Sequence, residues 1–133
     1  MGAWGRGVFE NDDAMDWTVA FLEGSSVDAL QDALDDALDS EDYLDSDQGS
    51  YALAAAELLA AATGRPCRDL PSGLGEWATA NPQIATPSLL ARARDAVDRV
   101  IGEDESELAE LWAESDEFED WLEEMEELKD RLS

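Results

Sequence analysis

Apolar residues recur at intervals of three and four along most of this chain, and acidic residues fill the positions between them. The clearest stripe lies in the segment 27–38 and consists of Val27, Leu30, Leu34 and Leu38. This spacing places the apolar side chains on one face of an α-helix. No run of β-branched residues with a period of two competes with it. The sequence therefore predicts an all-α fold, a compact bundle of five to six helices.

The N-terminal segment combines an irregular start with a helix signal. Three glycines among the first seven residues disfavour regular structure there. Trp4, Val8 and Phe9 are expected to fold back onto a neighbouring helix as an apolar arm. Asn11 and Asp12 are good N-cap residues, so a helix is predicted from there to the glycine at position 24. We favour a structural role over a binding role for the arm.

Capping signals predict the next two helices. Ser25 begins one of them, with Asp28 three residues later as in a capping box. The following helix starts near 47–50 and is alanine-rich, which allows another helix to approach closely. Gly64 and then Pro66 end it.

The middle of the chain predicts one short helical turn at 75–79 and then a longer helix. Thr86 and Pro87 form an N-cap and first-turn pair for that helix. Arg94 and Asp98 are expected to pair one turn apart on its outer side. Its predicted core face consists of Leu90, Ala93, Val97, Val100 and Ile101.

The acidic charge is large and unevenly distributed. The 133 residues include 34 acidic and 8 basic ones, which gives a net charge of −26. The block 1–64 carries 15 acidic residues and one basic, 65–102 carries four and five, and 103–133 carries 15 and two. All four prolines lie in the near-neutral block. We therefore predict one domain over 1–133, in which a Pro-rich connector joins two acidic helical lobes.

This charge excludes several classes of partner. Direct binding to nucleic acid or to an anionic membrane would oppose like charges, so neither partner is expected. The apolar run 52–62 is too short to span a bilayer, and the start of the chain lacks a signal-peptide pattern. The single cysteine, Cys67, cannot form an internal disulfide and fits a reducing compartment. A cytoplasmic location is predicted.

The C-terminal segment 108–132 has the longest apolar pattern. Its spacing of three and four is compatible with a coiled-coil dimer. Trp112, Trp121 and Leu128 widen the stripe, which favours packing against the same chain. The polar residues at 114–117 predict a break into two helices. We therefore favour a monomer, with a helical dimer through 108–132 as the alternative.

Three segments resemble one known family. They are MGAWGRGVFENDDAMDW at the start, YALAAAELLAAATGRP in the middle, and SELAELW followed by DWL near the end. In that order they resemble the family called domain of unknown function 4259. The resemblance implies a small, largely helical domain with no assigned activity, cofactor or catalytic residue. It marks a hallmark cluster of Trp4, Phe9, Asn11, Asp12, Asp16 and Trp17, and leaves open whether this cluster builds the fold or a site.

Catalysis and metal binding are not predicted. The chain has no histidine, which removes the usual general base near neutral pH and the commonest zinc ligand. Cys67 is interpreted as a half-buried free thiol. The loop from Asp45 starts like a calcium-binding loop, but Gly49 and Ala56 stand where oxygen ligands are required. We predict no catalytic, cofactor or metal residue; an enzyme that uses paired carboxylates is the least favoured alternative.

The acidity has three competing explanations. The favoured one is a solvated surface suited to a high-salt cytosol, because the chain has one lysine against seven arginines. The others are a surface for a basic protein, as in an immunity or inhibitor protein that imitates nucleic acid, and simple solubility. We expect function through protein contact, and the best contact face is Asp32, Asp35, Asp36 and Asp39. The residues expected to matter most for integrity are Trp4, Phe9, Trp17, Trp112 and Trp121.

Overall fold

The computed structural model describes residues 7–24, 27–39, 43–67, 70–102 and 105–133. In this part of the chain the helices are α1 (Asp12–Gly24), α2 (Val27–Asp39), α3 (Ser46–Ala62), α4 (Ser72–Ala80), the short 3₁₀ helix η1 (Pro82–Ile84), α5 (Pro87–Val100), α6 (Glu107–Ala113) and α7 (Phe118–Arg131). The all-α prediction is confirmed. The predicted number of five to six helices is too low, because the expected turn at 75–79 is a nine-residue helix, α4.

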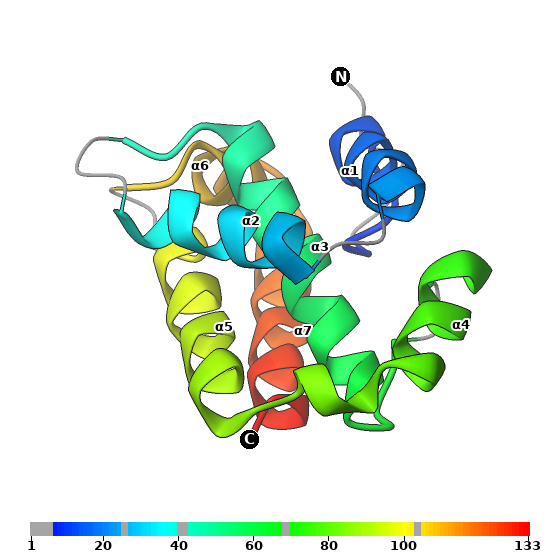
Figure 1. The fold of residues 1–133 in the computed structure, drawn as a ribbon. Helices are drawn as coiled ribbons and strands as arrows, with labels where there is room; N and C mark the ends of the chain where they lie inside the picture. The colour runs from blue at the N-terminus through cyan, green and yellow to red at the C-terminus, as the bar shows by residue number, and fades with distance from the viewer. Residues whose placement is uncertain (1–6, 25–26, 40–42, 68–69, 103–104) are drawn as a thin grey trace.

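Helix α3 lies at the centre of the molecule. In Figure 1, α2, α5 and α7 lie on one side of it, and α1 and α4 lie on the other. The residues 52–60 of α3 are all buried. A helix that is apolar on every side is stable only when neighbours cover every side, and small alanines let those neighbours come close. Glu57 is the one charged residue in this buried stretch.

Local signals explain where the central helices begin and end. The Asp45 backbone N–H donates to Gln48 Oε1 at 3.1 Å before the first turn of α3. Gly64 ends the same helix with a φ of 93°, a conformation that favours glycine. The Thr86 hydroxyl accepts from the Leu89 N–H at 3.2 Å, and Pro87 follows it as the first residue of α5. The end of α3 and the start of α5 are as predicted, whereas α3 begins at Ser46, one residue before the predicted start at 47–50.

The N-terminal arm is buried where the structure describes it. Val8 and Phe9 both belong to the core, as expected for an arm that folds back. Trp4, the third residue of the predicted arm, lies outside the described residues. The arm therefore contributes at least two side chains to the packing around α1 and α3.

The Pro-rich block 65–102 contributes directly to the core. Its prolines stand at or near helix ends: Pro66 and Pro71 in the segment between α3 and α4, Pro82 at the start of η1, and Pro87 at the start of α5. Between these points α5 packs on α2, α3 and α7. Its buried residues are Leu89, Ala93, Ala96, Val97 and Val100, so the predicted core positions Leu90 and Ile101 are only half-buried.

The C-terminal segment breaks into two helices, as predicted. The Ser115 hydroxyl accepts from the Glu117 N–H at 3.2 Å and donates to the Trp112 carbonyl at 2.8 Å, which stabilises the turn between α6 and α7. The rings of Trp112 and Trp121 stack with centroids 6.1 Å apart, and Trp121 is 1% exposed. The apolar positions of α7 are thus buried within the chain itself.

A clasp joins the segment before α3 to the start of α6. We use this name for the backbone pairing of Leu44 with Ser106. The Leu44 N–H donates to the Glu105 carbonyl, and the Glu107 N–H donates to the Leu44 carbonyl, both at 2.8 Å. The Tyr43 hydroxyl adds a hydrogen bond to Glu110, which raises the Tyr43 pKa to about 12. The clasp connects the two acidic lobes.

Candidate functional site

The hallmark cluster starts with a turn that caps α1. The Asn11 side-chain carbonyl accepts from the Ala14 N–H at 2.8 Å, and its amide donates to the Val8 carbonyl at 3.0 Å. The Gly7 N–H donates to Glu10 Oε1 at 3.1 Å, and the Glu10 N–H donates to the Gly7 carbonyl at 3.0 Å. Asn11 therefore satisfies an orphan helix donor and fixes the preceding turn. Together with buried Phe9, this part of the hallmark has a structural role.

Trp17 belongs to an aromatic cluster between α1 and α4. Its ring stacks on Phe21 at a centroid distance of 5.1 Å, and Phe21 meets the edge of Trp77 at 4.9 Å. Both arrangements suit the quadrupoles of aromatic rings. Phe21 is buried and the two indoles are half-buried. Trp17 is therefore also a structural member of the hallmark.

The hallmark residues Asp12 and Asp16 belong to a group of carboxylates that we call the acidic seam. It consists of Asp12, Asp13 and Asp16 on α1, together with Asp47 on the first turn of α3. Burial raises the pKa of Asp13, and the charges of Asp47, Asp16 and Asp12 raise it further. Burial and the charges of Asp13, Asp47 and Asp16 also raise the pKa of Tyr51 on α3. Among the described residues, no cationic side chain pairs with the seam.

The predicted contact face on α2 divides into two parts. Asp32, Asp36 and Asp39 are exposed. Asp35 is half-buried and pairs with Arg92 on α5. The structure therefore leaves three of the four carboxylates on an open surface and uses the fourth to hold α2 against α5.

The six cationic side chains that the structure describes all bind acceptors within the chain. Ion pairs join Arg92 to Asp35, Arg99 to Glu105, Lys129 to Asp98 and Arg131 to Glu57, while Arg65 and Arg94 donate to the carbonyl oxygens of Asp130 and Leu132. Most of these bonds connect different elements. The expected pair of Arg94 with Asp98 does not form, because both side chains reach C-terminal residues instead.

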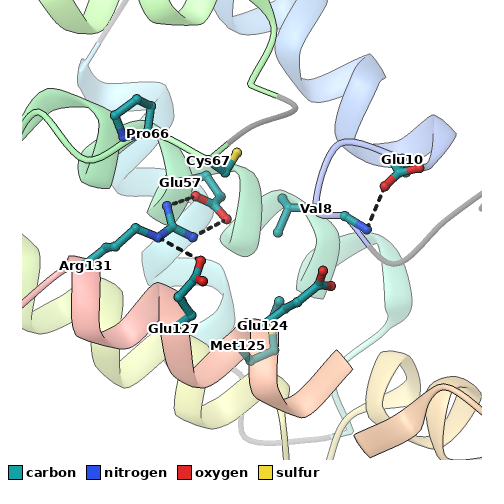
Figure 2. Close-up of a pocket in the computed structure, with 10 residues that line it drawn as sticks. Val8, Glu10, Glu57, Pro66, Cys67, Glu124, Met125, Glu127 and Arg131 are labelled. Atoms are coloured by element: carbon teal, nitrogen blue, oxygen red, sulfur yellow. Dashed lines mark hydrogen bonds and ion pairs between the residues drawn. The ribbon is translucent and has the colours of Figure 1, made fainter. Parts of the chain in front are cut away.

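A cavity of about 420 Å³ lies among the N-terminal arm, α3 and α7. Figure 2 shows Arg131 pointing from α7 to Glu57 on α3, with Glu127 beside it. Arg131 Nη1 and Nη2 donate to the two Glu57 oxygens at 2.7 and 3.1 Å, and Arg131 Nε lies 3.4 Å from Glu127 Oε1. The Glu57 side chain is 5% exposed. This bidentate pair is the most buried charged contact among the described residues.

The Glu57–Arg131 pair compensates the burial of its own two charges. Burial alone lowers the pKa of the Arg131 guanidinium, but the hydrogen bond and charge of Glu57 outweigh burial, so the pKa is raised and Arg131 stays charged. Arg131 Nη1 also donates to the Arg65 carbonyl at 3.2 Å. The half-buried thiol of Cys67 lines the same cavity. Because Nη1 and Nη2 both donate to groups inside the chain, while the buried Nε makes only the ion-pair contact with Glu127, Arg131 has a structural role in the cavity wall.

Comparison with known proteins identifies the family. The family model described as domain of unknown function (DUF4259) matches residues 2–124. The chain belongs to this family. Comparisons of this DUF4259 member with curated proteins and with solved structures gave no match. The resemblance predicted from the sequence is confirmed, and the family carries no assigned activity.

Sequence reasoning missed the Glu57–Arg131 pair of this DUF4259 protein. The partners are 74 residues apart, and with so many carboxylates no spacing marks one of them as special. One signal was available: Glu57 is a lone charge within an alanine- and leucine-rich helix, and a buried acid requires a partner. No described helix combines the length and apolar character needed to cross a membrane.

Proposed function

We propose that this DUF4259 protein is a non-enzymatic binding module whose acidic surface contacts a basic protein. The observation that carries the proposal is that the basic side chains bind acceptors within the chain itself. Every described basic side chain is bound within the chain, so the net charge of −26 is presented to a partner with little local compensation. Such a surface attracts basic partners and repels nucleic acid and anionic lipid.

The exposed carboxylates of α2 form the proposed contact face. Asp32, Asp36 and Asp39 lie three and four residues apart on one side of the helix, which separates neighbouring side chains by about 5–6 Å. The opposite side is fixed, because Leu30, Ala33, Leu34 and Ala37 are buried. A rigid row of carboxylates suits a row of arginines or lysines. We propose an inhibitor or immunity type of action, in which this row imitates a nucleic-acid backbone.

Affinity capture with matched variants tests the proposal. The bait is the whole protein, and the test variant carries Asp32→Asn, Asp36→Asn and Asp39→Asn. A control variant carries Glu119→Gln, Asp120→Gln and Glu123→Gln on the exposed side of α7, which removes the same charge elsewhere. We expect one basic protein to bind the wild type and the control, to bind the test variant at least about tenfold more weakly, and to dissociate as salt rises.

Three outcomes would contradict this function. Equal loss of binding in both variants would mean that only net charge matters, which supports adaptation to a high-salt cytosol as the reason for the acidity. Binding that is unaffected by either variant would exclude the acidic surface as the contact surface for the partner. Turnover of a substrate that survives neutralisation of the α2 face would instead favour the enzyme alternative.

We further propose that the protein acts as a monomer. Met125 and Leu132 from the predicted dimer stripe are buried inside the chain, and so are Trp121 and Leu128, which widen that stripe; this burial supports the proposal. Leu111 is the exposed large apolar residue of this segment. Sedimentation should give the mass of a single chain; a dimer that Leu111→Glu converts to a monomer would establish the coiled-coil alternative.

A further inference from the structure

Two of the three large apolar side chains that are exposed in the described part of the chain lie together. They are Tyr43, which is 42% exposed, and Leu111 on α6, which is 39% exposed; the third, Val19, lies on α1. Tyr43 and Leu111 line one open hollow of about 380 Å³ beside the clasp. Scattered apolar residues are ordinary on a protein surface, whereas adjoining ones form a patch of the kind that marks contact sites.

Glutamates surround these two side chains. Glu107, Glu110 and Glu114 line the same hollow, and none of the described residues that line it is basic. Tyr43, Leu111 and the three glutamates form what we call the clasp face. An apolar centre within a charged rim is the usual anatomy of a protein–protein interface, and tyrosine is enriched at such centres. The negative rim favours a partner that carries basic side chains at its own rim.

The clasp holds this face in a fixed shape. Its backbone pairing joins the segment that carries Tyr43 to the start of α6. The Tyr43 hydroxyl bonds to Glu110, and the Ser46 N–H donates to Glu107 Oε1 at 2.8 Å. Because these groups are fixed before a partner arrives, binding at the clasp face loses little conformational entropy.

The clasp face continues the α2 contact face. Asp39, the last residue of the α2 face, precedes Tyr43 by four positions, so their Cα atoms are at most about 14 Å apart. A protein–protein interface of standard size buries about 800 Å² on each partner. One partner can therefore cover both faces at once.

We propose that the clasp face is the docking site for a basic segment of the partner protein. An apolar side chain of that segment enters the hollow between Tyr43 and Leu111, and the arginines or lysines beside it meet the glutamates. This inference rests on the proposed function, because it takes the same class of partner, and it adds a source of specificity. Carboxylates alone attract any basic surface, whereas an apolar anchor distinguishes one basic segment from another.

Two synthetic peptides of equal charge test the inference on the intact protein. One peptide has a leucine between two pairs of arginines, and the other has a serine in place of that leucine. Fluorescence anisotropy measures the affinity of each peptide, and backbone amide chemical shifts locate its contacts. The test variants are Leu111→Gln and Tyr43→Gln. The matched control is Val19→Gln, because Val19 is 56% exposed on a different helix.

We expect the wild type to bind the leucine peptide about fivefold or more tightly than the serine peptide, because the leucine is removed from water. Leu111→Gln and Tyr43→Gln should each reduce this preference to about twofold or less, whereas Val19→Gln should retain it. In the wild type the leucine peptide should shift the amide signals of Tyr43 and Leu111.

The inference is overturned if the wild type binds the two peptides equally, or if the preference for leucine survives in Leu111→Gln. It is also overturned if the wild type sediments as a dimer that Leu111→Gln converts to a monomer, because a second copy then occupies the clasp face.

The variant with Asp32→Asn, Asp36→Asn and Asp39→Asn distinguishes failure of this inference from failure of the proposed function. It should weaken the binding of both peptides equally and leave the preference for leucine in place. Weaker binding in this variant without any preference for leucine in the wild type would overturn the clasp face alone. A preference for leucine with no effect of this variant would contradict the α2 contact face alone.

Discussion

Glu57 occupies a position where a charge is costly without a partner. It lies in the buried stretch of α3, and its two oxygens accept from the two Nη atoms of Arg131 on α7. A bidentate arginine–carboxylate pair has a defined geometry. It therefore fixes the register of α7 on α3 and also neutralises the buried carboxylate of Glu57. Removal of one partner leaves the other charge buried, and this loss exceeds the net contribution of the pair.

Arg131→Met is expected to lower the free energy of unfolding by about 3 kcal/mol, because it leaves the Glu57 carboxylate buried without its partner. The double variant Glu57→Leu with Arg131→Met should recover most of that loss, since apolar side chains of similar volume need no partner. Equilibrium denaturation in urea measures both changes.

The matched control for this pair is Arg92→Met, which breaks the pair of Arg92 with Asp35. Both of those side chains are more than 40% exposed, so solvent screens their attraction and the expected cost is at most about 1 kcal/mol. Equal costs for Arg92→Met and Arg131→Met would show that burial of the Glu57–Arg131 pair is not what makes it strong.

At the scale of one element, two glycines differ in whether they tolerate a side chain: one lies inside α3 and the other lies just after its last residue. Gly49 lies inside the helix, and a Cβ atom there would meet Leu108 Cδ2 at 3.4 Å and Val100 Cγ1 at 3.6 Å, which is ordinary contact. Gly64 has a φ of 93°, which side chains rarely adopt. The same substitution should therefore act in opposite directions at the two ends of α3.

We predict that Gly49→Ala stabilises the protein by about 0.5–1 kcal/mol, through helix propensity and lower entropy of the unfolded chain. Gly64→Ala should destabilise it by about 1 kcal/mol, through backbone strain at the helix end. Thermal unfolding of the two variants side by side measures the difference. A destabilising Gly49→Ala would show that the contact with α6 is tighter than the structure indicates.

Element boundaries were predictable where the cause is local. Thr86 and Pro87 start α5, and Gly64 ends α3, because capping depends on a few neighbouring residues. The length of α4 was underestimated because Gly73 and Gly75 weaken its helix signal, while Leu74 and Ala78 are buried by tertiary packing.

The site was less predictable than the helices. Asn11 was correctly predicted as a cap. Asp35 pairs with Arg92, which lies 57 positions later in the sequence, and Glu57 pairs with Arg131, which lies 74 positions later. Spacing along one helix carries no information about such distant partners. For the same reason the pair Arg94–Asp98, which suits an isolated helix, gives way to contacts with the C-terminal residues.

For the whole molecule, self-repulsion is the dominant electrostatic term at a net charge of −26. An increase in KCl from about 0.01 to about 1 M shortens the Debye length from about 30 to about 3 Å. We expect the melting temperature to rise by about 5 °C or more over this range, which corresponds to more than about 1 kcal/mol. Scanning calorimetry measures the shift.

A charge-reduced variant provides the comparison. The protein with Asp32→Asn, Asp36→Asn and Asp39→Asn carries three fewer negative charges, so its melting temperature should rise less with KCl than that of the wild type. A wild-type melting temperature that does not change with KCl would contradict both the salt-adapted explanation of the acidity and the importance of self-repulsion.

The clasp between Leu44 and Ser106 has a consequence for how the chain folds. The paired residues are 62 positions apart, so α3, α4 and α5 all lie within the loop that the pairing closes. Closure of so long a loop has a large entropic cost unless those helices have already come together. We therefore expect the two acidic lobes to meet late, on helices that are already packed, so that their mutual repulsion slows the last step of folding rather than the first.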